Sequence, residues 1–300
     1  MFPKINTASS PVDWLSVVQP SLFEITYSDS HNSAIKSFLE KNIELNLLII
    51  DPGGCQRTVN QMITDGEVIE SEARKIIAKI AIPKVNQKFM DLVLLGYVSS
   101  VEGYMRQLIR ELVNLDKTVR SNCELLPINF GATYYQSHDM FPEALMEGIS
   151  FASSNNIKKT CKDFLGVVFG NLKNNLDLKK ALNDFESVCQ IRHCVVHRFG
   201  KVGATNAIKL GMHEESFKDC LEKPLKMNFE TIQKASKVTL NLVKEINQFI
   251  FEEIMKRLAK DDNFWTWDFR KDKKLFTKYM SVFYEFEYPI VNEKIKECLS

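Results

Sequence analysis

The stretch that decides the fold is NQKFMDLVLLGYVSSVEGYMRQLIRELVNL, residues 86–115. Its apolar residues recur every three or four positions, a spacing that places them along one face of an α-helix. The stretch contains no proline, so nothing in it ends a helix early. We therefore expect one long amphipathic helix, whose apolar face consists of Leu94, Leu95, Val98, Val101, Met105, Ile109 and Leu112.

Two further segments show the same helical spacing. Residues 176–197 are followed by Gly200 and Gly203, which suit the end of a helix, and carry an apolar face of Ala181, Phe185, Val188, Val195 and Val196. Residues 229–259 carry a face of Ile232, Ala235, Leu242, Ile246, Phe249 and Ile250. Three long amphipathic helices predict a mainly α protein with a helical bundle at residues 86–260.

The segments outside these helices give weaker signals. We expect residues 1–85 to form a small α/β or irregular lead-in, with a helical pattern at 34–40, a β-like run NIELNLLII at 42–50, a turn at 51–54 and a helix at 67–80. Between the first two long helices we expect shorter helices, one of them starting at Pro142, and a β-like or irregular piece at NFGATYYQ, residues 129–136.

The C-terminal extension, residues 261–300, is aromatic and basic in its first half. The run FWTWDFRKDKKLFTKYM, residues 264–280, either stacks on nucleic-acid bases or docks on the bundle. We favour docking on the bundle, because aromatic side chains are first of all large apolar groups that gain from burial.

Composition bounds the class of protein. The chain has 300 residues, of which 45% are hydrophobic and 26% charged, the balance of a folded protein. Its formal net charge of +1 provides no global attraction for nucleic acid, so any such contact depends on a local patch. The seven cysteines form no Cys-x-x-Cys pair, which favours a reducing compartment. No apolar run reaches the length of a membrane span, and we expect a cytoplasmic protein without a membrane partner.

Arg192 lies in the middle of the apolar face of residues 176–197. An arginine keeps its proton at any physiological pH, so a buried guanidinium needs an anion such as a carboxylate or a phosphate. His193 and His197 are four residues apart on the flank of the same helical face, with Glu186 near them. These three basic residues are the candidate site.

Glu102 is the corresponding charged residue within the apolar face of residues 86–115. A buried carboxylate also needs a partner, and the simplest pairing is Glu102 with Arg192 across the helix interface. Such a pair either orients the guanidinium for function or serves only to hold the bundle together.

The segment CQIRHCVVHRFGKV, residues 189–202, contains Arg192, a polar residue after it, and His197 before a glycine-bearing turn. This pattern resembles the Arg-x(4 to 6)-His signature of the HEPN (higher eukaryotes and prokaryotes nucleotide-binding) superfamily. The resemblance covers about residues 86–260 and departs from many relatives at Arg198, which follows the histidine directly.

The resemblance implies a metal-independent endoribonuclease in which Arg192 and His197 are catalytic, His193 shares the work and Glu102 supports Arg192. It also implies RNA as substrate, a homodimer in which two copies of the motif form one cleft, no cofactor, and a toxin or antiviral defence setting with an antitoxin or other regulatory partner. The alternative within the same family is a catalytically silent module that binds nucleotide or RNA, or scaffolds a partner.

Two other interpretations of these residues stay open. His197 and His193 also suit a helix end, where a cation interacts favourably with the last carbonyl groups. Cys189, His193 and His197 follow one another at intervals of four, and two of them could bind zinc with further ligands from elsewhere. The three residues span about 12 Å along a helix, too far to hold one ion together.

Overall fold

Three long helices form the framework: α5 (Gln87–Leu115), α10 (Leu176–Arg198) and α13 (Phe229–Ala259). The computed structural model describes residues 33–48, 87–135, 137–170, 172, 175–212, 219–261, 264–266 and 268–284. The helices expected at 86–115, 176–197 and 229–259 are confirmed to within one residue at each end. The described residues contain no β-strand, and a single bridge joins Lys201 to Pro224.

Side-chain caps fix where the second and third long helices begin. The side chain of Asn175 accepts a hydrogen bond from the backbone N–H of Leu178 at 3.0 Å, and Asn228 does the same for Thr231 at 2.8 Å. Each cap satisfies one of the backbone donors that the first turn of a helix leaves without a partner. The helix boundaries therefore follow from local sequence as well as from the apolar pattern.

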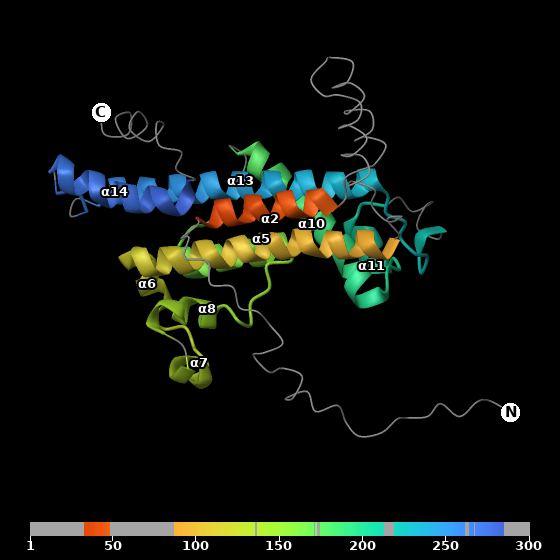
Figure 1. Cartoon of the computed structure of the whole chain (residues 1–300), viewed down its shortest axis with the longest axis horizontal. Coiled ribbons are helices and arrows are strands. Elements are labelled where there is room, and N and C mark those ends of the chain that lie inside the picture. The colour runs from red at the N-terminus through yellow and green to blue at the C-terminus, as the bar shows by residue number, and fades with distance from the viewer. Residues whose placement is uncertain are drawn as a thin grey trace, which may run out of the picture. The chain divides into compact units, whose positions relative to one another are not determined.

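Helix α2 (Ala34–Leu48) packs against both α5 and α13, and Figure 1 shows it beside these two helices. Ala34 and Phe38, one turn apart, are fully buried and belong to the core. Asn42, the next residue on this face, contacts Ser236 of α13 through its side chain at 3.2 Å. The β-like interpretation of residues 42–50 is therefore wrong as far as Leu48, because packing of a helical face overrides the short alternating pattern.

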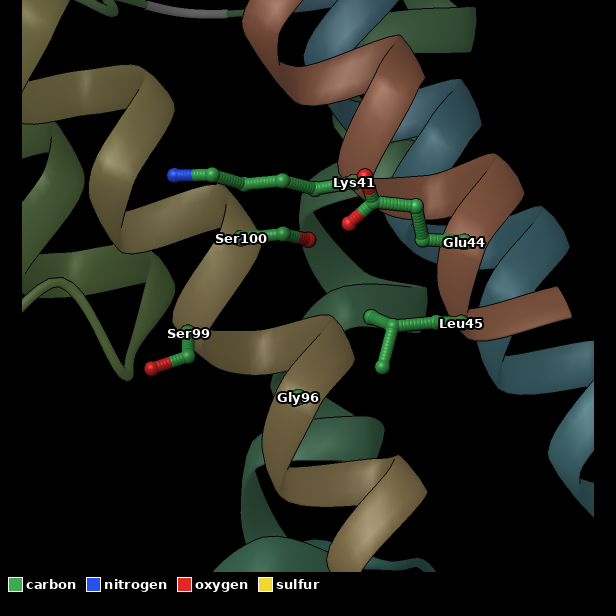
Figure 2. Close-up of a pocket in the computed structure, with 6 residues that line it drawn as sticks. All are labelled: Lys41, Glu44, Leu45, Gly96, Ser99 and Ser100. Atoms are coloured by element: carbon green, nitrogen blue, oxygen red, sulfur yellow. The ribbon is translucent and has the colours of Figure 1, made fainter. Parts of the chain in front are cut away.

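Gly96 permits the close approach of α2 to α5. A Cβ atom at Gly96 would lie 2.7 Å from Cδ2 of Leu45, closer than such atoms come in proteins. Figure 2 shows the Leu45 side chain pointing from α2 toward this glycine. The expected turn at 51–54 and helix at 67–80 lie outside the described residues, as do residues 1–32.

Short helices connect α5 to α10. They are α6 (Lys117–Cys123), α7 (Phe130–Tyr135), η2 (His138–Met140), α8 (Phe141–Leu145), α9 (Ser154–Thr160) and the π-helix η3 (Cys161–Leu165). The helix expected at Pro142 is confirmed, with this proline in its first turn. The β-like or irregular interpretation of residues 129–136 is wrong, because residues 130–135 are helical. At the start of this helix the Asn129 side chain accepts a hydrogen bond from the N–H of Gly131 at 3.3 Å.

The C-terminal helix α14 (Phe269–Phe283) packs against α2, α5 and α13. Phe283 and Tyr279 are buried in the main core, and Asn247 of α13 donates a hydrogen bond to the carbonyl oxygen of Phe283 at 2.9 Å. The hydroxyl of Tyr279 donates to Asp116, which directly follows α5, at 3.1 Å. Phe276, Tyr279 and Phe283 of this helix are thus buried, whereas Phe269 in its first turn is exposed.

Candidate functional site

The last turn of α10 and the loop after it form the candidate site. The helix ends because Phe199 and Gly200 adopt positive φ angles of 53° and 84°. The N–H of Gly200 then donates to the carbonyl oxygen of Cys194 at 2.9 Å and so satisfies one of the last carbonyl groups of the helix. Gly200 therefore acts as the predicted helix stop. Gly203 has a different role, since a Cβ there would lie 2.9 Å from Nε of Arg198.

The structure brings His193 and His197 together. Their ring centroids lie 4.6 Å apart with an angle of 46° between the ring planes, and both side chains are exposed. Arg192 is half-buried, because the apolar face of α10 emerges from the bundle near its C-terminal end, where Val196 is exposed. All three basic residues are thus in contact with solvent.

The predicted pairing of Glu102 with Arg192 is wrong. Glu102 lies 3.5 Å from Arg106, one turn further along α5, and Arg192 forms no ion pair within the described part of the chain. A helical wheel gives the direction of a side chain around the axis but not its position along the axis, so it does not define which residues of two helices meet. The loop after α10 lies near the beginning of α5, since Gly200 accepts a hydrogen bond from Leu225 N–H at 2.7 Å and Gln87 accepts one from Met227 N–H at 2.9 Å.

Positive charges surround His193. Its pKa is lowered from the usual value of 6.5, first by partial desolvation and then by the charges of His197, Arg192, Lys209 and Arg198. Arg198 is paired with Glu222, so its charge is partly neutralised. Arg192 and Lys209 have no such partner among the described residues, and they make this end of α10 a local cationic patch on a nearly neutral chain.

Lys209 comes from α11 (Ala204–Lys209), which a buried polar contact holds against α10. Asn206 donates to the side-chain oxygen of Gln190 at 3.0 Å, and both residues are buried. Gln190 in turn donates to Glu186 at 2.8 Å, and the other carboxylate oxygen of Glu186 accepts from the N–H of Ser154 at 3.0 Å. Glu186 therefore supports the scaffold, and the hydrogen bonds it shares fix α11 beside the histidines.

A zinc site built on Cys189, His193 and His197 has little structural support. Cys189 is buried in the main core, and burial raises the pKa of its thiol, which disfavours the thiolate that binds metal. The two histidines are exposed instead. Within the residues that the structure describes, no three His, Cys, Asp or Glu side chains are grouped so that they could hold a metal ion.

Two hollows occur elsewhere in the described surface. One, of about 480 Å³, lies between α2 and α5 and is lined by Lys41, Glu44, Leu45, Gly96, Ser99 and Ser100 (Figure 2). The other, of about 380 Å³, lies beside α9 and η3 and includes Asn156, Lys159 and Asp163. Neither of these two includes a residue of the candidate site, where His193 and His197 are exposed and Arg192 is half-buried.

The sequence did not reveal two residues of this surface, Lys209 and Phe199. Lys209 reaches His193 only because α11 folds back on α10, a contact between residues of different helices. Phe199 is 88% exposed and directly follows α10. Its position directly before Gly200 was the signal that could have found it, because the residue at this point of a helix end is usually glycine.

Comparison of the chain with family models, with curated proteins and with solved structures gives no match. None of the described helices is long and apolar enough to cross a membrane.

Proposed function

We propose that this protein is a metal-independent endoribonuclease of the HEPN type, with its site at the end of α10. The observation that carries the proposal is the contact of the His193 and His197 rings beside Arg192 and Lys209, two cations without an ion-pair partner among the described residues. Cleavage of RNA by its own 2′-OH needs a base, an acid and positive charge for the phosphate, and imidazole and guanidinium groups can fill these roles.

The two histidines divide the proton transfers. A lowered pKa keeps His193 neutral at pH 7, so it accepts the proton of the attacking ribose 2′-OH. His197 donates a proton to the leaving 5′ oxygen. Arg192 binds two non-bridging oxygens of the phosphate as charge develops on them. The new bond joins the 2′ oxygen to phosphorus, the bond to the 5′ oxygen breaks, and the products are a 2′,3′-cyclic phosphate and a 5′-hydroxyl.

The proximity of the rings explains why the pair does both tasks. With 4.6 Å between the centroids, charge on His197 disfavours protonation of His193. His193 is therefore assigned the role of base and His197 that of acid. DNA lacks the attacking hydroxyl, so RNA is the proposed substrate.

A homodimer completes the proposed site. His193 and His197 are exposed in the single chain, and a second copy facing them would provide the walls of a cleft and exclude water. The proposal includes a cytoplasmic location and a toxin or antiviral defence setting with an antitoxin or other regulatory partner. The same exposure favours the second candidate function, a silent module that binds RNA or nucleotide without cleaving it.

The test is cleavage of a panel of end-labelled RNAs in EDTA. We expect the wild type to cut with 2′,3′-cyclic phosphate ends, and Arg192→Ala, His193→Ala and His197→Ala to lose most of the activity. His138→Ala and Arg270→Ala are matched controls, since both residues are exposed and lie outside the site. If the folded wild type binds RNA but cuts none, the silent module replaces the enzyme.

A further inference from the structure

Phe199 combines two features that do not contribute to the stability of the fold. It is 88% exposed, so its ring gains little from removal of apolar surface from water. Its φ of 53° and ψ of 36° lie in the left-handed region, which is unfavourable for a residue with a side chain. Glycine or asparagine is the usual residue at this point of a helix end. A role other than packing therefore accounts for the phenylalanine.

The surroundings indicate what its ring contacts. Phe199 lies two residues beyond His197, at the end of α10 where Arg192 and Lys209 bring positive charge that no described carboxylate pairs with. A ligand that offers an anion to these cations and a flat apolar face to an aromatic ring is a nucleotide with an unstacked base.

The exposed aromatics of α7 provide a contrast. Phe130, Tyr134 and Tyr135 are as exposed as Phe199, but the surrounding segment, residues 121–150, contains no lysine or arginine. The arginines that reach this region from α5, Arg106 and Arg110, are paired with Glu143, so their charge is partly neutralised and attracts a phosphate less. Exposure alone does not distinguish the two surfaces, whereas charge does.

We propose that Phe199 is the stacking platform for a base next to the phosphate held by Arg192, so that the protein recognises unpaired nucleotides. This inference rests on the proposed ribonuclease function and specifies its substrate as single-stranded RNA. Stacking is tolerant of base identity, so Phe199 selects unpaired regions rather than one sequence. Duplex RNA keeps its bases stacked inside the helix and gains nothing from this ring.

The test uses Phe199→Asn, which accepts the left-handed backbone but removes the ring, and Phe199→Trp, which keeps a ring. Binding is measured with a single-stranded 2′-O-methyl oligonucleotide, which cannot be cleaved, and with its duplex. We expect Phe199→Asn to bind the single strand roughly 5- to 150-fold more weakly than wild type and the duplex equally well. Phe199→Trp should retain affinity, and its added fluorescence should be quenched on binding. Tyr135→Ala, the matched control, should bind as wild type.

Three results separate the possible failures. If Phe199→Asn binds the single strand as tightly as wild type while Arg192→Ala binds it more weakly, the stacking proposal is overturned and the proposed ribonuclease function stands. Equal binding and cleavage by Arg192→Ala and wild type, or no binding by wild type, overturns the ribonuclease function and the stacking proposal together. A lower Tm for Phe199→Asn, or a change from dimer to monomer in sedimentation, shows a structural or subunit contact and also overturns stacking. We expect the Tm to stay the same or rise.

Discussion

Asp116 connects three parts of the fold, and its replacement should strongly destabilise the protein. One carboxylate oxygen caps α6 by accepting from the N–H of Val119 at 2.9 Å, and the other forms an ion pair with Arg257 of α13. The second oxygen also accepts from the hydroxyl of Tyr279 on α14 at 3.1 Å. Only 1% of Asp116 is exposed, so solvent cannot replace these partners.

The expected loss follows from what Asp116→Ala leaves behind. Removing one partner of a buried ion pair costs about 3 to 5 kcal/mol, and the lower end applies because the Arg257 side chain is 29% exposed. Loss of the α6 cap adds about 1 kcal/mol. We expect the free energy of unfolding to fall by about 4 kcal/mol in Asp116→Ala. In Asp116→Asn, which keeps the cap and the volume but not the charge, it should fall by about 2 kcal/mol.

Urea unfolding measures both variants against wild type. The midpoints should decrease in the order wild type, Asp116→Asn, Asp116→Ala, with an unchanged dependence of free energy on urea concentration. A loss below about 1 kcal/mol in Asp116→Ala would falsify the assignment of this carboxylate as a buried tie between α6, α13 and α14. Equal losses in the two variants would show that the charge contributes nothing.

The remaining predictions concern the surroundings of the candidate site. NMR titration should give His193 a pKa below about 6.5, and Lys209→Gln should raise it, because a positive charge that disfavours the imidazolium has been removed; no change in Lys209→Gln contradicts the cationic patch. The pKa of His193 is lower in the folded than in the unfolded chain, so at pH values between these two pKa values the unfolded chain binds more protons. The contribution of His193 to the free energy of unfolding is therefore present above about pH 6.5 and falls as the pH drops below it. In His193→Gln this part of the pH dependence, measured by urea unfolding, should disappear. Asn206→Ala leaves the side-chain oxygen of Gln190 without its donor and should lower the free energy of unfolding in urea by about 1 to 3 kcal/mol. It should also raise the pKa of His193, because Lys209 on α11 is held less firmly beside it. An unaltered His193 titration would show that α11 keeps its position without this contact.

The sequence predicted the three long helices because each repeats an apolar face over about four to five turns. It failed at residues 42–48, where a short alternating run also fits a helix, and burial of Ala34 and Phe38 against α5 and α13 decides the outcome. The run at residues 129–136 failed similarly, since six helical residues are too few to show a period.

For the site, the sequence predicted the cluster of basic residues but not its surroundings. His193 and His197 lie together because four residues make one helical turn, which is local information. The partner of Glu102 depends on how far α5 is shifted along α10, and the approach of Lys209 depends on the fold of α11. Both are tertiary properties that a single helical wheel does not contain.

The central claim is that this surface cleaves RNA by attack of a ribose 2′-OH. The most direct measurement uses an RNA that the wild type cuts in EDTA and a copy with one 2′-deoxyribose at the nucleotide preceding the cut. The proposed mechanism predicts that cleavage at this position disappears in the substituted strand, and that the unmodified strand ends in a 2′,3′-cyclic phosphate there. Continued cleavage after the deoxyribose, or a product with a 3′-hydroxyl, would contradict it.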